Sequence, residues 1–448
     1  MDIFLSDELQ TLYENRVANL DKPQLTPEHI MPILDDFATR DGVSRISIGQ
    51  SFCDQTINCI SMGFGSRKVL MWTQMHGDES TATAAVLDII HLLTEDLCTS
   101  LNANWQSLLT IHIIPMLNPD GAAAGTRENA QGIDINRDAL VLQTPEGQAL
   151  DAFVEKIHPN FAFNLHDQHD YYRCGKHGKS STLAFLAPAF DPQKTIDPAR
   201  HKAMALIALM QAQANSLLPE GIARYNDEFS ARSFGDQIAE RGISTILIES
   251  GHYPNAPNRQ VARSMNVFVL LHALNMLCTE SDWTSDEKLK QLEMEYWKIP
   301  ENQEHKLCDL LIKGLAFAGN SYTTDIAIRK QSRFDTFVTV ADVGDLHEQY
   351  GLHTIDALGY TYDPGRSFLL IEKLYLTNES YIDLLKKGFN HFVGNVSLIT
   401  NHSDYIVIEN PKYWHDDKKM SKGITPAGFL CMNGERKFAI VMGEILPL

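Results

Sequence analysis

Residues 75–79, Met-His-Gly-Asp-Glu, constrain the fold of this chain more than any other segment. They follow a mostly apolar run over 69–75, typical of a buried strand, and precede a run over 80–93 with apolar residues at helical spacing. His76 and Glu79 are therefore predicted in the turn after a strand's carboxyl end, where open α/β sheets carry their sites. One imidazole and one carboxylate supply two of the three protein ligands of a catalytic zinc ion. Such a pair also arises by chance and does not by itself establish a metal site.

Predicted strands and helices alternate along the first part of the chain. Strands are expected over 43–48, 57–63, 108–114, 161–165, 183–186 and 243–248, and helices over about 195–217, 258–278 and 286–297. This alternation indicates an α/β domain with a parallel or mixed sheet. The first domain is expected over 1–297, with a helical lead-in over about 1–40.

The character of the chain changes at the polar, proline-containing segment 298–302, which reads as a domain boundary. Beyond it the sequence is mostly β, with strands expected over 322–329, 336–341, 368–375, 405–409 and 437–442. We therefore expect a smaller β-rich accessory domain over 303–448.

Further residues suited to catalysis lie at the ends of predicted strands or in the loops beside them. They are Arg127, Asn136, Arg137, His166 and Glu249. Glu249 is hard to explain as a packing residue, because a carboxylate at the end of a buried strand needs a partner. By itself, His166 could be an ordinary strand-end histidine. Asp134 and Asp138 could simply balance Arg127 and Arg137 as ion pairs.

In this order the motifs resemble the zinc metallocarboxypeptidase family, which includes pancreatic carboxypeptidases and bacterial peptidoglycan-peptide amidases. The NPDG turn at 118–121, followed by TRENAQGIDINR over 126–137, is most similar to the compact bacterial branch. The resemblance covers roughly residues 40–280. It implies a mixed β-sheet flanked by helices. The ligand set known for this family implies that His76, Glu79 and His166 hold one zinc ion per chain.

The resemblance also implies roles for the other residues. Glu249 would be the general base and acid, taking a proton from zinc-activated water and passing it to the leaving amine. Arg127 would stabilise the oxyanion. Asn136 and Arg137 would bind a substrate carboxylate, to which a guanidinium offers two parallel donors. Asp138 stands where many members carry a second Asn, which puts a simple preference for a C-terminal residue in doubt.

Three functions remain open on this basis. The first is a zinc-dependent exopeptidase or amidase that removes a terminal amino acid from a peptide. The second is a deacylase of N-acyl amino acids, similar to the aspartoacylase and succinylglutamate desuccinylase relatives, which also carry a C-terminal β domain. The third is an inactive binding scaffold, which would normally have lost the base or a ligand. The first two imply a substrate with a free carboxylate, either a peptide or an N-acyl amino acid.

Composition excludes some partners. A net charge of -19 argues against nucleic acid or an anionic membrane as the main partner, although local arginines can still bind an anionic small substrate. The N-terminus lacks a signal-peptide pattern, and no run reaches the roughly 18 apolar residues that span a bilayer. The seven cysteines are scattered, without a CxxC pair, as in reduced thiols. We therefore expect a cytoplasmic protein with neither a nucleic-acid nor a membrane partner.

Overall fold

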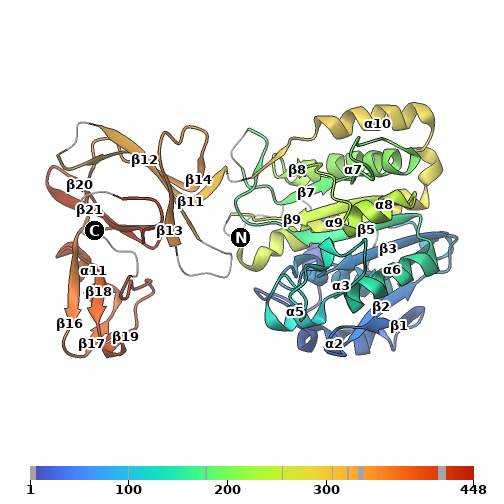
Figure 1. Cartoon of the computed structure of the whole chain (residues 1–448), viewed down its shortest axis with the longest axis horizontal. Helices are drawn as coiled ribbons and strands as arrows, with labels where there is room; N and C mark the ends of the chain where they lie inside the picture. The colour runs from blue at the N-terminus through green and yellow to red at the C-terminus, as the bar shows by residue number, and fades with distance from the viewer. Residues whose placement is uncertain are drawn as a thin grey trace. The chain divides into compact units, whose positions relative to one another are not determined.

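The computed structural model describes residues 7–98, 100–176, 179–254, 256–304, 306–319, 322–330, 338–411 and 420–448. The chain falls into two compact units, Met1–Gln303 and Glu304–Leu448 (Figure 1). The first unit is a mixed α/β domain and the second is rich in β-strands, which confirms the predicted fold class.

An eight-stranded mixed sheet forms the centre of the first unit, in the order β1-β2-β4-β3-β5-β9-β7-β8. Its strands are β1 (Val43–Gln50), β2 (Thr56–Met62), β3 (Arg67–Thr73), β4 (Leu109–Ile114), β5 (Phe161–Asp167), β7 (Leu183–Leu186), β8 (Ile222–Arg224) and β9 (Ser244–Ser250). Strands β4, β3, β5 and β9 run parallel to one another. Their carboxyl ends therefore meet at one edge of the sheet, where sites of α/β proteins are built.

Helices cover both faces of this sheet. One face carries α2 (Pro27–Phe37), α3 (Thr81–Thr94), α7 (Pro198–Leu217), α9 (Gln260–Cys278) and α10 (Asp286–Lys298), with α1 (Asp7–Glu14) beside them. The other carries α6 (Pro145–Ile157) and α8 (Phe234–Glu240). Two short helices, α4 (Trp105–Leu108) and α5 (Pro119–Ala124), lie in the connections around β4. A small ladder of β6 (Arg173–Cys174) with β10 (Asn302–Gln303) ties residues 302–303 to the first unit.

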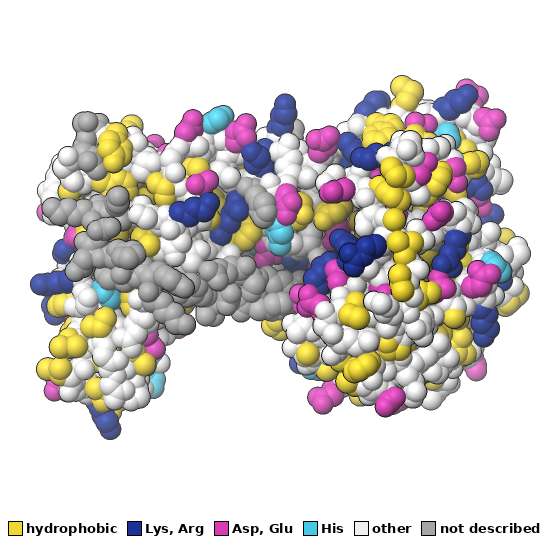
Figure 2. All heavy atoms as spheres, viewed as in Figure 1, with side chains coloured by type: hydrophobic (Ala, Val, Ile, Leu, Met, Phe, Trp, Pro, Cys, Tyr) yellow, Lys and Arg dark blue, Asp and Glu magenta, His cyan; other side chains and the backbone are white. Residues whose placement is uncertain are grey.

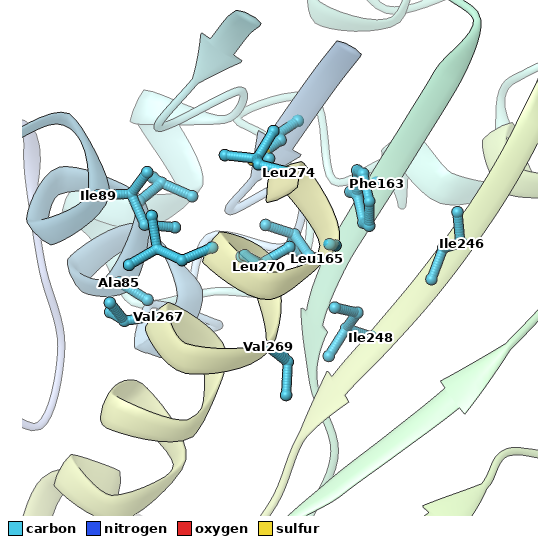
Figure 3. Close-up of a cluster of buried hydrophobic side chains, with 14 of the residues drawn as sticks. Ala85, Ile89, Phe163, Leu165, Ile246, Ile248, Val267, Val269, Leu270 and Leu274 are labelled. Carbon is cyan, nitrogen blue, oxygen red and sulfur yellow. The ribbon is translucent and has the colours of Figure 1, made fainter. Parts of the chain in front are cut away.

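Helix α9 lies in the core of the first unit. Figure 3 shows Val267 of this helix on the side of Ala85 and Ile89 of α3, and Val269 on the side of Ile248 of the sheet. By length and composition α9 could cross a membrane, but most of it is buried inside the protein. Its apolar composition is explained by this core position.

A buried ion pair fastens α9 to α3. Both carboxylate oxygens of Asp88 accept hydrogen bonds from Arg263, at 2.7 Å each. Arg263→Met should lower the free energy of unfolding by about 3–5 kcal/mol, because it leaves the Asp88 charge buried without its partner. Urea unfolding followed by circular dichroism measures this loss. A change below about 1 kcal/mol would show that the pair contributes little.

One predicted turn is a helix start instead. Asn118-Pro119-Asp120-Gly121 was expected to form a turn, but it opens α5. The Asn118 side chain accepts a hydrogen bond from the Gly121 amide at 2.9 Å and caps the helix. Pro119 takes the first helical position, where its missing N–H costs nothing.

The second unit is built on one main sheet, ordered β13-β12-β11-β15-β20-β21-β22, with β14 paired to β11. Two small ladders, β16-β18 and β17-β19, lie next to α11 (Asn378–Lys386). The strands are β11 (Leu307–Phe317), β12 (Thr323–Lys330), β13 (Val338–Gly344), β14 (Tyr350–Asp356), β15 (Thr361–Asp363), β16 (Arg366–Leu370), β17 (Leu374–Leu376), β18 (Phe389–Gly394), β19 (Ile399–Asn401), β20 (Ala427–Met432), β21 (Glu435–Val441) and β22 (Glu444–Pro447).

Two strand predictions in this unit are wrong. The run 368–375 is broken between β16 and β17, where Ile371 is exposed and the charged pair Glu372-Lys373 follows it. Residues 405–409 make only a single bridge, at Glu409. The carbonyls of Tyr405 and Ile406 accept from the side chains of Asn401 and Tyr381, and within the described residues only that of Ile408 accepts from a strand amide, that of Phe392. The expected strand start at 336–337 lies outside the described residues.

Surface charge is mixed in sign. On the face drawn in Figure 2, acidic and basic side chains are interspersed over both units. The net charge of -19 is therefore not gathered into one acidic surface on this face.

Candidate metal centre

The turn between β3 and α3 carries His76 and Glu79 to the carboxyl edge of the sheet. Gln74 adopts a left-handed backbone with φ 49°, and its side-chain amide donates to the Gly77 carbonyl at 2.8 Å. A Cβ at Gly77 would lie 2.0 Å from the carbonyl carbon of Gly121. Only glycine therefore lets this turn approach α5 so closely, and the two ligand candidates are held on a tightly packed segment.

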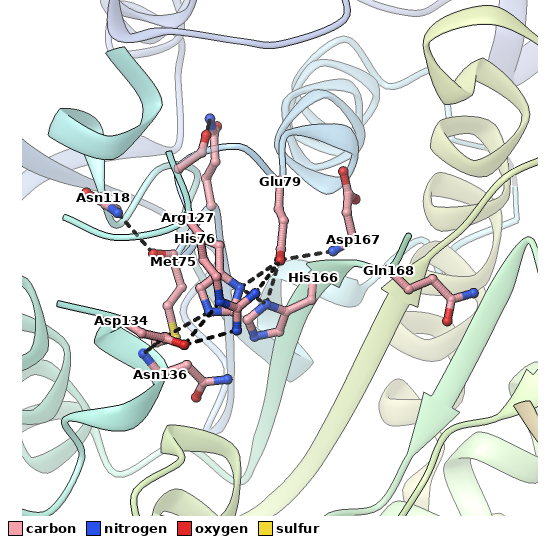
Figure 4. Close-up of polar contacts among 12 residues, drawn as sticks. Met75, His76, Glu79, Asn118, Arg127, Asp134, Asn136, His166, Asp167 and Gln168 are labelled. Atoms are coloured by element: carbon pink, nitrogen blue, oxygen red, sulfur yellow. Dashed lines mark hydrogen bonds and ion pairs between the residues drawn. The ribbon is translucent and has the colours of Figure 1, made fainter. Parts of the chain in front are cut away.

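His76, Glu79 and His166 form one buried cluster (Figure 4). His76 Nδ1 lies 2.7 Å from Glu79 Oε1, and His166 Nδ1 lies 2.7 Å from Glu79 Oε2. The two Nδ1 atoms are 3.1 Å apart. One possible ligand atom from each residue lies within 4.8 Å of the other two. His166 comes from the end of β5, so the structure brings together residues 90 positions apart in the sequence.

The geometry of this cluster fits a zinc ion. Two nitrogens bound at 2.0–2.1 Å to one tetrahedral zinc lie about 3.3 Å apart, close to the spacing of the two Nδ1 atoms. Burial alone would raise the pKa of Glu79, but the neighbouring His76 and His166 hold it well below its usual range, so the carboxylate is ionised. Three protein ligands leave the fourth tetrahedral position open, as in catalytic zinc sites.

Asp134 links the cluster to Arg127. Its Oδ1 lies 3.0 Å from His76 Nε2, and its Oδ2 accepts from Arg127 Nε at 3.1 Å. Burial alone would raise the pKa of Asp134, but the hydrogen bond with His76 and the positive charge of Arg127 lower it below its usual range. The sequence indicated an ion pair with Arg127 and missed the contact with His76. A carboxylate on the far nitrogen of a ligand histidine fixes the orientation of its ring.

Asp134→Asn should weaken zinc binding by roughly 10–100-fold, because the amide cannot accept from His76 and Arg127 as the carboxylate does. Competition with a chromophoric chelator measures the zinc Kd. Asp138→Asn is the matched control from the same loop. Its carboxylate is buried and accepts from the Thr144 amide and hydroxyl, at 2.7 and 2.8 Å, away from the cluster. Equal losses of zinc affinity in the two variants would contradict a specific role for Asp134.

Glu249 lies directly across from His166 in the parallel β5-β9 pair. It is buried, and its carboxyl group forms no hydrogen bond or ion pair with any residue that the structure describes. Burial, followed by the negative charge of Glu79, raises the pKa of Glu249 well above its usual range. A carboxyl group with this raised proton affinity, beside a candidate metal site, has the properties of a general base.

Arg127, Asn136 and Arg137 lie along the loop that carries Asp134. Arg127 is half-buried, and its NH1 donates to Glu79 Oε1 at 3.3 Å. Asn136 accepts from the Phe234 amide at 3.0 Å, and its own NH2 has no partner among the described residues. Arg137 is exposed, and one of its amino groups donates to the Asn136 carbonyl at 2.7 Å. The loop thus presents donors from an amide and a guanidinium next to each other.

The sequence suggested that Asp138 balances Arg137, and the structure places it otherwise. Within the described residues, Asp138 binds the Gln143 and Thr144 amides and forms no ion pair with Arg137. It therefore fixes the loop ahead of α6, and its charge is satisfied by backbone donors.

Comparisons with known proteins point to one family. The zinc carboxypeptidase family profile matches residues 30–215. An uncharacterized protein of Zymomonas mobilis is 27% identical over 215 residues, which cover 47% of this chain and 50% of that protein. A probable carboxypeptidase 2 of Trichophyton verrucosum is 25% identical over 184 residues, covering 40% of this chain and 30% of that protein. Murein peptide amidase A of Escherichia coli is 27% identical over 146 residues, covering 26% of this chain and 54% of the amidase.

The matched segments span about half or less of these relatives' lengths. Among solved structures, a metallo-carboxypeptidase from Burkholderia cenocepacia aligns with a TM-score of 0.47 and 18% identity, over 58% of this chain and 70% of that one. The profile match covers His76, Glu79, Arg127, Asn136, Arg137 and His166, and Glu249 lies beyond it. Residues 30–215 of the first unit therefore match a zinc carboxypeptidase domain.

Proposed function

We propose that the first unit hydrolyses the amide bond of a terminal amino acid in a peptide, with zinc held by His76, Glu79 and His166. The observation that carries this proposal is the position of Glu249. A buried carboxyl group without a partner among the described residues lies beside a buried cluster of two His and one Glu. The zinc carboxypeptidase match over residues 30–215 supports the same reaction class.

Each step has a residue suited to it. A bound zinc ion supplies Lewis acidity that polarises the scissile carbonyl and makes water acidic near neutral pH. Glu249 would accept a proton from the attacking water and then donate it to the leaving nitrogen. Its raised pKa increases its proton affinity for the first of these transfers. The guanidinium of Arg127, oriented by Asp134, donates to the negative charge that develops on the carbonyl oxygen.

Asn136 and Arg137 are proposed to bind the substrate's terminal carboxylate. The NH2 of Asn136, which has no partner within the described part of the chain, and the exposed guanidinium of Arg137 are adjacent donors. Arg232 adds a third group beside them, since its Nε donates to the Arg137 carbonyl at 2.9 Å. A carboxylate bound here would place the last peptide bond of the substrate near the candidate zinc site of His76, Glu79 and His166. This position would limit cleavage to the carboxyl-terminal residue.

Arg137→Met should raise KM by roughly 10–100-fold with a smaller change in kcat, because a charge-assisted hydrogen bond to the carboxylate is lost. Steady-state assays on one peptide with a free and an amidated C-terminus measure the effect. The wild type should prefer the free carboxylate, and the variant should lose most of that preference. An unchanged preference would exclude Arg137 from carboxylate binding.

Product analysis by mass spectrometry tests the reaction itself. The zinc-loaded protein is incubated with a pool of free-carboxylate peptides, cell-wall-type peptides and N-acyl amino acids. Release of single amino acids from peptides is expected. Release from N-acyl amino acids alone would assign the protein to the deacylases. No release from any substrate, with zinc bound, would favour a binding scaffold.

A further inference from the structure

Arg259, at the start of α9, is buried at the carboxyl ends of two neighbouring strands. Its NH1 donates to the Ser250 carbonyl at 2.6 Å, and its NH2 donates to the Gln168 carbonyl. Gln168 follows His166 by two residues, and Ser250 follows Glu249 by one. One guanidinium therefore holds together the strand ends that carry a candidate zinc ligand and the candidate base.

The charge of Arg259 also acts, through Asp167, on the surroundings of Glu79, another candidate zinc ligand. Its NH1 lies 3.7 Å from Asp167 Oδ2, and its NH2 donates to Asp170 at 2.6 Å. The Asp167 amide donates to Glu79 Oε2 at 3.1 Å. Asp167 Oδ2 also accepts from the Thr81 hydroxyl at 2.8 Å, at the start of α3. Arg259 thus stabilises the carboxylate of the residue whose backbone binds Glu79.

The backbone at this position is strained. Asn258 and Arg259 both have left-handed conformations, with φ 51° and 53°. Asparagine tolerates this region, but for arginine it is unfavourable. Such strain persists only where surrounding contacts over-determine the conformation, and it is concentrated at functional sites. The contacts around this turn include those of the Arg259 guanidinium and a hydrogen bond from the Asn258 side chain to Asp21.

We infer that Arg259 is a positioning residue, which keeps His166 and Glu249 at the separation that the hydrolytic step requires. This inference rests on the proposed function. Arg259 acts through the strand ends, with its donors occupied by protein carbonyls and Asp170. Its loss should misplace Glu249 relative to the metal ligands while the fold of the unit persists.

Arg263 provides a matched control one turn further along α9. It is also buried and also bound to an aspartate, but that partner is Asp88 of α3. A purely structural role for Arg259 would make the corresponding variants of the two arginines behave alike. If Arg259 positions the site, its variants should differ from the Arg263 variants in zinc affinity and in kcat.

The test compares Arg259→Lys with Arg263→Lys in the full chain. The measurements are the thermal unfolding midpoint, the zinc Kd by chelator competition, and kcat and KM for a cleaved peptide. We expect Arg259→Lys to lower kcat by about 100-fold with KM within a few-fold, as for a small misplacement of a reacting group. Its zinc Kd should rise by roughly 10-fold. Arg263→Lys should lower the unfolding midpoint and leave the zinc Kd and kcat unchanged.

Chemical rescue provides a readout that a structural role would not move. Added methylguanidinium should restore part of kcat in Arg259→Ala and should have no effect on Arg263→Ala. If the Arg259 variants do not fold, Asp170→Asn weakens the same contacts and should shift zinc Kd and kcat in the same direction. Equal zinc Kd and kcat in the Arg259 and Arg263 variants, or no shift in Asp170→Asn, would overturn the inference.

The zinc measurement separates failure of this inference from failure of the proposed function. If the wild type cleaves no substrate, the proposed function fails. The zinc Kd of the Arg259 variants still shows whether this arginine positions the three candidate zinc ligands. An unchanged zinc Kd in that case would overturn the inference as well.

Discussion

Glu249→Gln is expected to lower kcat for release of a terminal amino acid by about 10²–10⁴-fold, with one zinc ion per chain retained. The amide has nearly the shape of the carboxyl group but cannot take a proton from water. The register of β5 and β9 places Glu249 beside His166, but Glu249 is not one of the three candidate ligands. The zinc content of the variant should therefore not change. Single-turnover assays with zinc-loaded protein measure the loss.

Glu146→Gln is the matched control for this substitution. Glu146 is also buried, but it accepts from the Phe52 amide and from Asn129, on the α6 side of the sheet. Its substitution should leave kcat per folded molecule unchanged. Activity in Glu249→Gln equal to that of the wild type would exclude Glu249 as the base, and loss of zinc in that variant would place it in the metal site.

His166→Ala is expected to cause the second large effect, loss of tight zinc binding together with loss of hydrolysis. His166 Nδ1 faces both His76 and Glu79, and its removal leaves two of the three ligand candidates. The fall in zinc affinity should exceed the roughly 100-fold that loss of an outer partner of a metal ligand causes. Isothermal titration of the chelator-stripped protein with zinc measures it.

His112→Ala serves as the control for His166→Ala. His112 lies in β4, its Nδ1 is 2.8 Å from the Ser61 hydroxyl, and burial lowers its pKa to about 4. This histidine is part of the sheet and not of the cluster, so the variant should bind zinc as the wild type does. Wild-type zinc affinity in His166→Ala would contradict the assignment of that residue as a ligand.

The sequence was most informative where local pattern and chemistry coincide. The apolar run before His76 and the helical spacing after it predict a strand, a turn and a helix, which are β3, the ligand turn and α3. Ile246 and Ile248 read as a buried strand, and Glu249 follows them at the end of β9. Short parallel strands of this kind are continuous apolar runs, so the strand ends could be located from the sequence.

Contacts between residues that are far apart in the chain could not be predicted from the sequence. In the sequence, Arg259 lies in the first turn of the predicted helix over 258–278 like any other polar residue. Its proposed role depends on the approach of α9 to β5 and β9. Asp134 could be matched with Arg127 by charge, but its contact with His76 requires the fold. In the second unit, the segment around Tyr405 has strand-like residues, yet side-chain donors occupy its carbonyls.

Titration of the chelator-stripped protein with zinc, followed by mass-spectrometric detection of released amino acids, tests the central claim most directly. The predicted result is hydrolysis that rises with added zinc and saturates at one equivalent per chain, while Glu249→Gln binds the same equivalent and releases nothing. Full hydrolysis without metal, or one bound zinc in the wild type with no product from any substrate in the pool, would contradict the account.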